Sequence, residues 1–354
     1  MNIFSLEKRS AIPPLLKQGR ASKRRVSNAG FLLLSLLSVA GFVAAIFINR
    51  LFPQIAEVKI SAYAIGAFPD LSINQAYQIV LGGLILLYIG IAVFSFFDEA
   101  RREQFIKRVP FRFAIGLALA LWDVLGTKLQ SLPQPFFPGP AKIIESFLME
   151  GPYIWQNTLY SLRLFAVGFL VGVAFGVGTG ILIGWFPKVY YWVYPVLKIT
   201  GVIPAVAWMP FALTLFPTPF LAAAFLIVIC AWFPVAFLTA QGIQSTPKVH
   251  FEVARTLGAK TPYLVFRVAI PHALPQIFTG ISTANAYAFT TLVMSEMMGQ
   301  PGGLGYYINA SKVWSAYYKV FAAIIVMAIL FSLIMKGMGM LQNHVLRWQR
   351  GLVK

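Results

Sequence analysis

The sequence predicts an all-α membrane protein that crosses the bilayer several times. Of its 354 residues, 58% are hydrophobic and only 11% are charged, and the mean hydropathy is +0.74. Soluble domains carry about 25% charged residues. Apolar stretches of about 20 residues, long enough to cross the hydrocarbon core, recur from residue 31 onward. Backbone groups in lipid must pair internally, and long apolar runs without period-two alternation favour helices over a barrel.

Eight apolar stretches are expected to be membrane spans. They cover residues 31–49, 75–97, 113–127, 158–185, 190–216, 220–243, 276–298 and 320–341. The first stretch follows a basic segment and contains small residues, so a cleaved signal peptide is the alternative interpretation. We favour an uncleaved span, because a second span follows after a short loop.

The basic residues are unevenly distributed between the two predicted sides of the membrane. The net charge is +18, but a nucleic-acid-binding protein would carry its Lys and Arg in a patch on a soluble surface. Most of the 29 Lys and Arg residues lie in the amino-terminal tail, in segment 98–112, in loop 246–275 and at the carboxyl end. The opposite side holds only Arg50, Lys59, Lys128, Lys142, Lys312 and Lys319. The positive-inside rule therefore predicts that both termini and loop 246–275 are cytoplasmic.

One expected span carries glycine at every fourth position. These residues are Gly168, Gly172, Gly176, Gly180 and Gly184. Glycines at this spacing form one smooth stripe, which lets another helix approach closely. The alternative is that glycine is simply frequent in membrane helices. We favour helix packing, because the fourfold repeat is unbroken.

The span predicted over residues 190–216 contains Pro195, Pro204 and Pro210. Each proline removes a backbone donor and kinks or breaks a helix. A broken helix is tolerated in the membrane where it is buried in protein or lines a cavity. Pro204 and Pro210 are thus candidates for a translocation path, with a plain packing kink as the alternative. Glu296, an ionisable residue within a predicted span, is a third candidate. It either helps to gate or shape the outer end of the path or is satisfied by helix contacts or outer water.

The polar loop 246–275 separates two strongly apolar segments and predicts a helix, a corner and a second helix. Pro247 and Pro262 each follow a threonine, as in an N-cap followed by proline at the first helical position. Gly258 falls where the first helix should end, and glycine accepts the left-handed backbone of a helix C-terminus. Apolar residues recur along both helices at helical spacing, so one stripe can rest on the membrane domain while the other surface docks a partner. They are Val249, Val253 and Leu257 in the first helix and Tyr263, Phe266 and Ile270 in the second.

The spacing within this loop carries a family resemblance. The residues are Glu252, Ala254 and Gly258, then nine residues, then Val268, Ala269, Ile270 and Pro271. The pattern resembles the E-A-A, three residues, G, nine residues, I-x-L-P loop of binding-protein-dependent ABC importer permeases. Val253, Val268 and Ile270 depart mildly from it. The alternative is an ordinary amphipathic connector, in which Gly and Pro only mark turns and helix ends.

Two further segments are similar to the nitrate, sulfonate, taurine and bicarbonate branch of these permeases. They are the proline-rich run 201–210 and the residues from Ser295 to Tyr306 around Glu296. The resemblance implies the transmembrane domain of a type I ABC importer, with a six-helix core, over residues 113–354. Two extra transmembrane helices, residues 31–112, and a basic cytoplasmic tail, residues 1–30, precede it. We have no functional interpretation for the extra helices.

The resemblance also implies partners in the cell inner membrane. These are separate ABC ATPase subunits that bind the coupling loop 246–275, an extracytoplasmic solute-binding protein and a second permease subunit, expected to form a homodimer. ATP and Mg²⁺ would be bound by the ATPase, and this chain would bind no cofactor. The solute is expected to be a small anion such as nitrate, a sulfonate, taurine or bicarbonate.

The sequence carries no motif for catalysis. It has no phosphate-binding loop, no cluster of His and Cys at zinc spacing and no nucleophile elbow. Its single cysteine, Cys230, excludes a disulfide within the chain. We therefore expect a transport subunit without a metal site or an enzyme activity. An ion-gradient-driven secondary transporter is the alternative, although its expected internal repeat is not evident. A membrane enzyme or channel is disfavoured.

Overall fold

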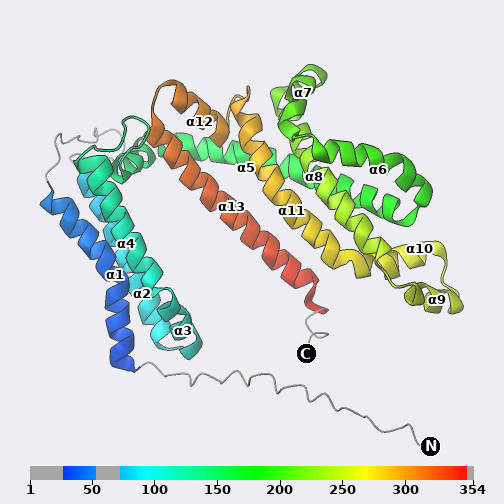
Figure 1. Cartoon of the computed structure of the whole chain (residues 1–354), viewed down its shortest axis with the longest axis horizontal. Coiled ribbons are helices and arrows are strands. Elements are labelled where there is room, and N and C mark those ends of the chain that lie inside the picture. Colours follow the sequence, from blue (N-terminus) through cyan, green and yellow to red (C-terminus); the bar gives the residue numbers. More distant parts are fainter. Residues whose placement is uncertain (1–26, 53–71, 349–354) are drawn as a thin grey trace, which may run out of the picture. The chain divides into compact units, whose positions relative to one another are not determined.

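The computed structural model describes residues 27–52 and 72–348, and its regular elements are helices (Figure 1). Most of the predicted basic tail, residues 1–30, lies outside the described residues. Seven described helices are long and apolar enough to cross a membrane, and an eighth span results if one sharply bent pair is counted. The sequence predicted eight spans, of which the bent pair is the fifth.

The first half of the described chain contains the helices that precede the bent pair. They are α1 (Asn28–Leu51), α2 (Ile73–Phe96), α3 (Glu99–Lys107), α4 (Val109–Asp123) with the π-helical turn η1 (Val124–Lys128), and α5 (Pro140–Trp185). Segment 98–112, expected to be a basic loop, mostly forms α3, whose N-cap Asp98 accepts a 2.9 Å hydrogen bond from the Ala100 N–H. α5 begins well before the span expected over residues 158–185, and it has a kink at Glu150 just before Gly151 and Pro152.

The second half begins with the bent pair. It contains α6 (Pro187–Val202), the 3₁₀ turn η2 (Ala205–Trp208), α7 (Met209–Leu215), α8 (Pro219–Gln244), α9 (Lys248–Thr256), α10 (Thr261–Tyr263), the π-helical turn η3 (Leu264–Ala269), α11 (Ile270–Met297), α12 (Leu304–Val313) and α13 (Tyr317–Val345). The span expected over residues 190–216 is broken, as its prolines predicted, and the chain bends by 102° between α6 and the η2–α7 segment.

The chain divides into two compact units. Among the described residues, unit 1 comprises residues 27–51 and 79–121, and unit 2 comprises residues 52, 72–78 and 122–348. The expected domain boundary at residue 113 falls within α4, whose residues up to Leu121 belong to unit 1. Within unit 1, α1 and α4 cross at Gly41 and Gly116, where a Cβ on either glycine would collide with the backbone of the other helix.

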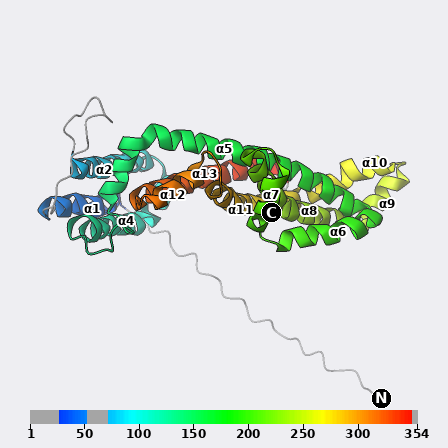
Figure 2. The ribbon, with the colours of Figure 1, turned by 90° about the horizontal axis from the view of Figure 1, so that it is seen from above.

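The core of unit 2 is built around α8. Its buried face contains many small residues, including Ala223, Ala224, Ala231, Ala236 and Ala240. α5 packs on α8 along its length, and α11 packs on it as well, so that these three helices contribute the largest buried cluster. α6 also packs against α8, and α12 and α13 form a second cluster with the start of α5. Figures 1 and 2 show α6 and α8 beside α5.

The glycine stripe of α5 faces α8. A Cβ built on Gly168, Gly176 or Gly180 would lie 2.7, 2.6 or 2.5 Å from the Cβ of Ile227, Val235 or Thr239. Such distances are far below van der Waals contact, so these positions accept only a hydrogen atom at the present helix separation. A Cβ on Gly172 would lie 2.8 Å from the Ala231 Cβ, and one on Gly184 would lie 3.0 Å from the Ala240 Cα, so the contact is slightly less tight at these two positions. The stripe therefore sets how closely α5 and α8 approach.

Candidate functional site

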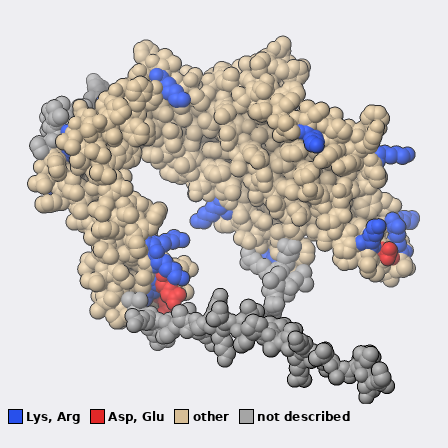
Figure 3. All heavy atoms as spheres, viewed as in Figure 1, with Lys and Arg blue, Asp and Glu red and all other residues tan. Residues whose placement is uncertain are grey.

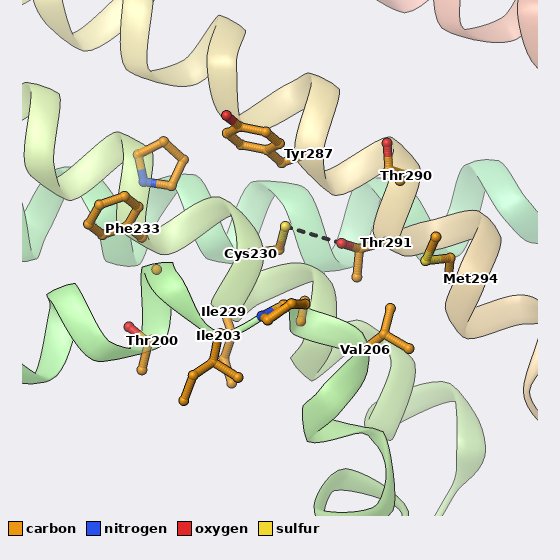
Figure 4. A pocket seen from close by; sticks show the side chains of 14 residues that line it. Thr200, Ile203, Val206, Ile229, Cys230, Phe233, Tyr287, Thr290, Thr291 and Met294 are labelled. Atoms are coloured by element: carbon orange, nitrogen blue, oxygen red, sulfur yellow. Dashed lines mark hydrogen bonds between the residues drawn. The ribbon is translucent and has the colours of Figure 1, made fainter.

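A cavity of about 520 Å³ lies in unit 2 between the broken segment, α8 and α11 (Figure 4). The broken segment contributes residues from Thr200 to Val206, α8 contributes Ile229, Cys230, Phe233 and Pro234, and α11 contributes Tyr287, Thr290, Thr291 and Met294. The lining contains hydroxyl groups, aromatic rings and a thiol, and none of these described lining residues is charged. It can hold a small solute by hydrogen bonds without a counter-charge.

The conformational limits of Pro204 explain why α6 ends beside this cavity. Ile203 precedes Pro204 and has φ −76° and ψ 123°, the extended conformation to which a residue before proline is restricted. Pro204 has no N–H to continue α6, and it becomes the N-cap of η2. The helix therefore stops at Val202. Pro204 lines the cavity, whereas Pro210 is one of the first residues of α7, where proline is tolerated, and is not among the lining residues.

Within the lining, α8 and α11 are joined by a hydrogen bond of 3.1 Å from the Thr291 hydroxyl to the Cys230 sulfur (Figure 4). Gly201 lies against the ring of Phe233, where a Cβ would collide with the ring carbons. The sequence analysis did not single out Phe233, Tyr287 or Thr291. These residues come from helices that are distant in sequence, so no local motif marks them.

Glu296 lies outside this cavity. It is fully buried near the end of α11, and its Oε2 accepts a hydrogen bond of 2.8 Å from the Gly305 N–H. A Cβ on Gly303 or Gly305 would collide with the Glu296 side chain. The carboxylate therefore lies at the N-terminus of α12, where free N–H groups and the helix dipole favour a negative charge.

Two more side chains complete this cap on α12. Asn157 Oδ1 accepts a hydrogen bond from the Gly303 N–H at 2.9 Å, and Ser161 Oγ accepts one from the Leu304 N–H at 2.8 Å. Both residues lie on α5. Glu296 Oε2 is bound at the N-terminus of α12, whereas its buried Oε1 has no hydrogen-bond partner among the described residues, so these helix contacts satisfy only one of the two carboxylate oxygens.

We expect Glu296→Ala to lower the stability of the folded chain by about 1–3 kcal/mol, because it leaves the buried Gly305 N–H without an acceptor. Glu296→Gln keeps an acceptor oxygen and should cost less. The measurement is thermal unfolding of the purified chain, with transport assayed per folded molecule. Unchanged unfolding of Glu296→Ala combined with lost transport would instead place the carboxylate on the solute path.

A second polar cluster lies where α5 kinks. The Tyr307 hydroxyl of α12 donates a hydrogen bond of 2.7 Å to Glu150 Oε2, and the Lys319 ammonium of α13 pairs with Glu150 Oε1. Burial, and then the hydrogen bond to Glu150, raise the pKa of Tyr307 well above its usual value, so the phenol stays protonated and remains the donor. The cluster joins three helices at the end of unit 2 that carries α12.

Loop 246–275 forms the predicted helix, corner and helix. Gly258 has φ +84°, which is the left-handed region, and α9 ends in a Schellman motif. The Ala259 N–H bonds the Ala254 carbonyl at 3.0 Å, and the Gly258 N–H bonds the Arg255 carbonyl at 2.9 Å. Ala254 of the motif therefore supplies the carbonyl that closes the corner.

The predicted threonine caps are wrong by one residue each. Pro247 is the N-cap of α9, and Lys260 is the N-cap of α10, with no side-chain capping bond at either. The second helix does not end at the membrane domain. It continues through η3 into α11, so that Thr261–Met297 is one continuous helical segment of 37 residues.

The apolar residues of this loop are mostly exposed. Val249, Val253 and Leu257 on α9 are 61%, 55% and 83% exposed, and Tyr263 and Phe266 are 55% and 66% exposed. The expectation that one of these stripes rests on the membrane domain is wrong. Other residues anchor the loop instead: Phe251 packs edge-on against Trp185, and Leu264, Val265 and Ala269 are buried.

The remaining motif residues lie on both sides of the corner. Glu252 is exposed, and Val268, Ile270 and Pro271 are half-buried where η3 meets α11. His250 and His272, which are isolated in the sequence, have ring centres 6.1 Å apart. Among the described residues, no three His, Cys, Asp or Glu side chains form a group that could hold a metal ion.

Residues 172–350, which include the cavity and the loop, match the family model of the binding-protein-dependent transport system inner membrane component. The chain belongs to this family. It is a multi-pass inner-membrane permease of the ABC importer class, as the loop spacing predicted. The matched residues include the motif of loop 246–275, the broken segment and Glu296.

Curated relatives fall in the predicted branch of these permeases. The chain is 31% identical over 236 residues to the putative aliphatic sulfonates transport permease protein SsuC of Bacillus subtilis, covering 66% of this chain and 85% of the relative. It is 28% identical over 241 residues to the taurine transport system permease protein TauC of Escherichia coli, covering 66% and 87%. It is 28% identical over 240 residues to the nitrate import permease protein NrtB of Synechococcus elongatus, covering 62% and 82%.

A solved structure of the MetNI methionine ABC transporter, in an inward-facing conformation, is similar to part of this permease. The TM-score is 0.47 at 23% identity, over 56% of this chain and 99% of that chain.

Proposed function

We propose that this permease forms the translocation path of an ATP-driven importer and couples it to a separate ATPase through loop 246–275. The observation that carries the proposal is the exposed apolar surface around Gly258. It lies on a segment that also carries Lys248, Glu252 and Arg255, so this segment faces water rather than lipid. Apolar side chains gathered on a water-facing surface mark a protein interface. The occupant is the ATPase subunit, which supplies the nucleotide site that this sequence lacks.

The continuity of the second coupling helix with α11 supports a mechanical link. Thr261–Met297 is one helical segment, and α11 contributes Tyr287, Thr290, Thr291 and Met294 to the cavity. At 1.5 Å per residue, the corner and the cavity wall are separated by about 40 Å of helix. Movement of the loop by the ATPase is transmitted along α11 to the solute path. The contact must differ between nucleotide states, because a contact that is equal in both shifts no equilibrium.

The transported solute is proposed to be a small anion of the kind named for the relatives: a sulfonate, taurine, nitrate or bicarbonate. An uncharged lining binds an anion only weakly, so the anion can leave the path as easily as it enters. Selection is then performed by an extracytoplasmic binding protein. A second permease subunit, in a homodimer, completes the path. The chain itself is no enzyme and binds no metal or cofactor, with ATP and Mg²⁺ on the partner.

The membrane topology follows the basic residues. With both termini and loop 246–275 on the cytoplasmic side, the exposed basic residues of the loop face the cytoplasm, as the positive-inside rule requires. They are Lys248, Arg255, Lys260 and Arg267. Figure 3 shows Lys and Arg gathered at the end of the molecule that carries α9 and α10.

The test is ATP hydrolysis by the reconstituted complex. The chain is expressed with the ATPase and binding protein encoded beside it and placed in lipid, and candidate anions are titrated. We expect hydrolysis to rise only when the loaded binding protein is present. Val253→Asn should prevent the ATPase from purifying with the chain, because it puts an amide into the docking surface.

Val313→Asn is the matched control for this test. Val313 is 76% exposed at the end of α12, against 55% for Val253, and it lies outside the coupling loop. The same change there should leave the bound ATPase unaffected. Uptake that follows a proton or sodium gradient without any bound ATPase would favour a secondary transporter instead.

A further inference from the structure

Unit 1 contains a buried arginine, one of whose guanidinium nitrogens has no hydrogen-bond partner among the described residues. Arg112, in the first turn of α4, is 7% exposed, and its Nη1 has no hydrogen-bond partner among the described residues. Its guanidinium carbon lies 4.1 Å from the ring centre of Phe105 and 5.0 Å from that of Tyr88. The rings hold the cation by their π faces, and its Nη1 forms no hydrogen bond to either residue.

Segment 98–112, which contains Arg112, carries more basic than acidic residues, five against three. Arg108 lies one helical turn earlier, is exposed, and forms no ion pair with any acid in the described part of unit 1. Arg102 lies over the ring of Phe31 at 4.8 Å and donates to Asn28 Oδ1 and to the Ser27 carbonyl. Figure 3 shows Lys and Arg, with Asp and Glu beside them, on the part of unit 1 that carries α3. A buried guanidinium in such surroundings requires an anion.

The depth of Arg112 in the membrane indicates which anion is available. α4 with η1, Val109–Lys128, is a span of 20 residues, which at 1.5 Å per residue is about the thickness of the hydrocarbon core. Arg112 is its fourth residue, so its Cα lies only about 5 Å inside the boundary. A long side chain at that depth reaches the level of the lipid phosphates.

We propose that Arg112, assisted by Arg108, binds the phosphate of an anionic phospholipid, so that unit 1 is a lipid-binding module of this permease. The planar fork of arginine matches two phosphate oxygens. An anionic headgroup is favoured over a zwitterionic one, because the ammonium of the latter is repelled by the neighbouring arginines. This inference is independent of the proposed transport cycle, since it concerns residues outside the family match.

The test uses the full-length chain in nanodiscs of phosphatidylethanolamine, with and without phosphatidylglycerol. Native mass spectrometry counts the phosphatidylglycerol molecules that stay bound after extraction. We expect the wild-type chain to retain phosphatidylglycerol and Arg112→Gln to lose it, with a drop in apparent affinity of roughly tenfold, because charge-assisted hydrogen bonds are the strong ones. Arg108→Gln, at an exposed position where folding is not at risk, should give a smaller loss.

Arg101→Gln is the matched control. Arg101 also lies over an aromatic ring, Phe94 at 4.5 Å, but it pairs with Asp98 at 3.1 Å. The same change of charge there should leave lipid retention unchanged. Equal retention by Arg112→Gln, Arg108→Gln and the wild type would overturn the proposal. Thermal protection of the wild type by inorganic phosphate, equal to that by phosphatidylglycerol, would overturn the assignment to lipid.

Discussion

Replacing Gly180 by valine is expected to prevent stable assembly of unit 2. A Cβ at this position would lie 2.5 Å from the Thr239 Cβ and 2.7 Å from the Ala236 carbonyl oxygen. The second of these is backbone and cannot turn away, so α5 and α8 must separate and lose contacts along the whole stripe. Overpacking of a core costs about 1–3 kcal/mol, and we expect a loss at or above the upper end. The measurement is the yield and thermal unfolding of the chain in detergent.

Gly178 provides the control on the same helix. A Cβ there meets no atom within 4 Å, and the residue is exposed. Gly178→Val therefore introduces the same side chain two residues away without overpacking. We expect it to fold and unfold as the wild type does. Similar behaviour of the two variants would show that helix propensity, and not close packing against α8, determines the role of the stripe.

Replacing Gly258 by proline is expected to abolish coupled transport while leaving insertion into the membrane intact. The corner has φ +84°, and proline is fixed near −65°, so the Schellman motif cannot form. A penalty of about 3 kcal/mol on the native corner corresponds to a loss of roughly a hundredfold in the population of the docking-competent loop. Uptake by the reconstituted complex is measured, together with the amount of chain in the membrane.

The variant Gly258→Asn tests whether the corner requires the left-handed backbone conformation or glycine itself. Asparagine tolerates the left-handed region, and no atom lies within 4 Å of a Cβ at Gly258. Gly258→Asn should therefore retain most of the transport activity. Normal uptake by Gly258→Pro would remove the corner from the coupling mechanism.

Local signals in the sequence predicted a large part of this fold. Hydropathy located the spans, since a bilayer imposes a minimum length on each apolar run. The left-handed residue at the corner was predicted because glycine is favoured there. The fourfold glycine repeat indicated a close helix contact, but the partner α8 is not encoded in the repeat itself. The small residues of α8, such as Ala224, Ala231 and Ala236, could be identified as the surface that contacts the stripe only from the structure.

Other features depend on contacts between segments that are far apart in sequence. The 102° bend needed Pro204 together with packing of η2 and α7 on α8, so proline content predicted a break but neither its position nor its angle. Glu296 was ambiguous, because its partner Gly305 lies across a loop. The cavity residues Phe233 and Tyr287 are ordinary apolar helix residues when viewed singly. Arg112 looked like one more basic residue of a cytoplasmic segment until Phe105 and Tyr88 enclosed it.

The π-helical turn η3 also fixes a rotational phase. A π turn accommodates one residue more than an α-helix of the same length, and each residue of an α-helix turns the chain by about 100°. Leu264–Ala269 therefore determines the direction in which α9 and α10 face relative to the Tyr287 and Thr291 side of α11. Removing one residue there would leave the remaining residues of the loop unchanged. It would still rotate α9 and α10 about the axis of α11 by about 100°, which is more than a quarter turn. The coupling segment is thus specified by its length as well as by its residues.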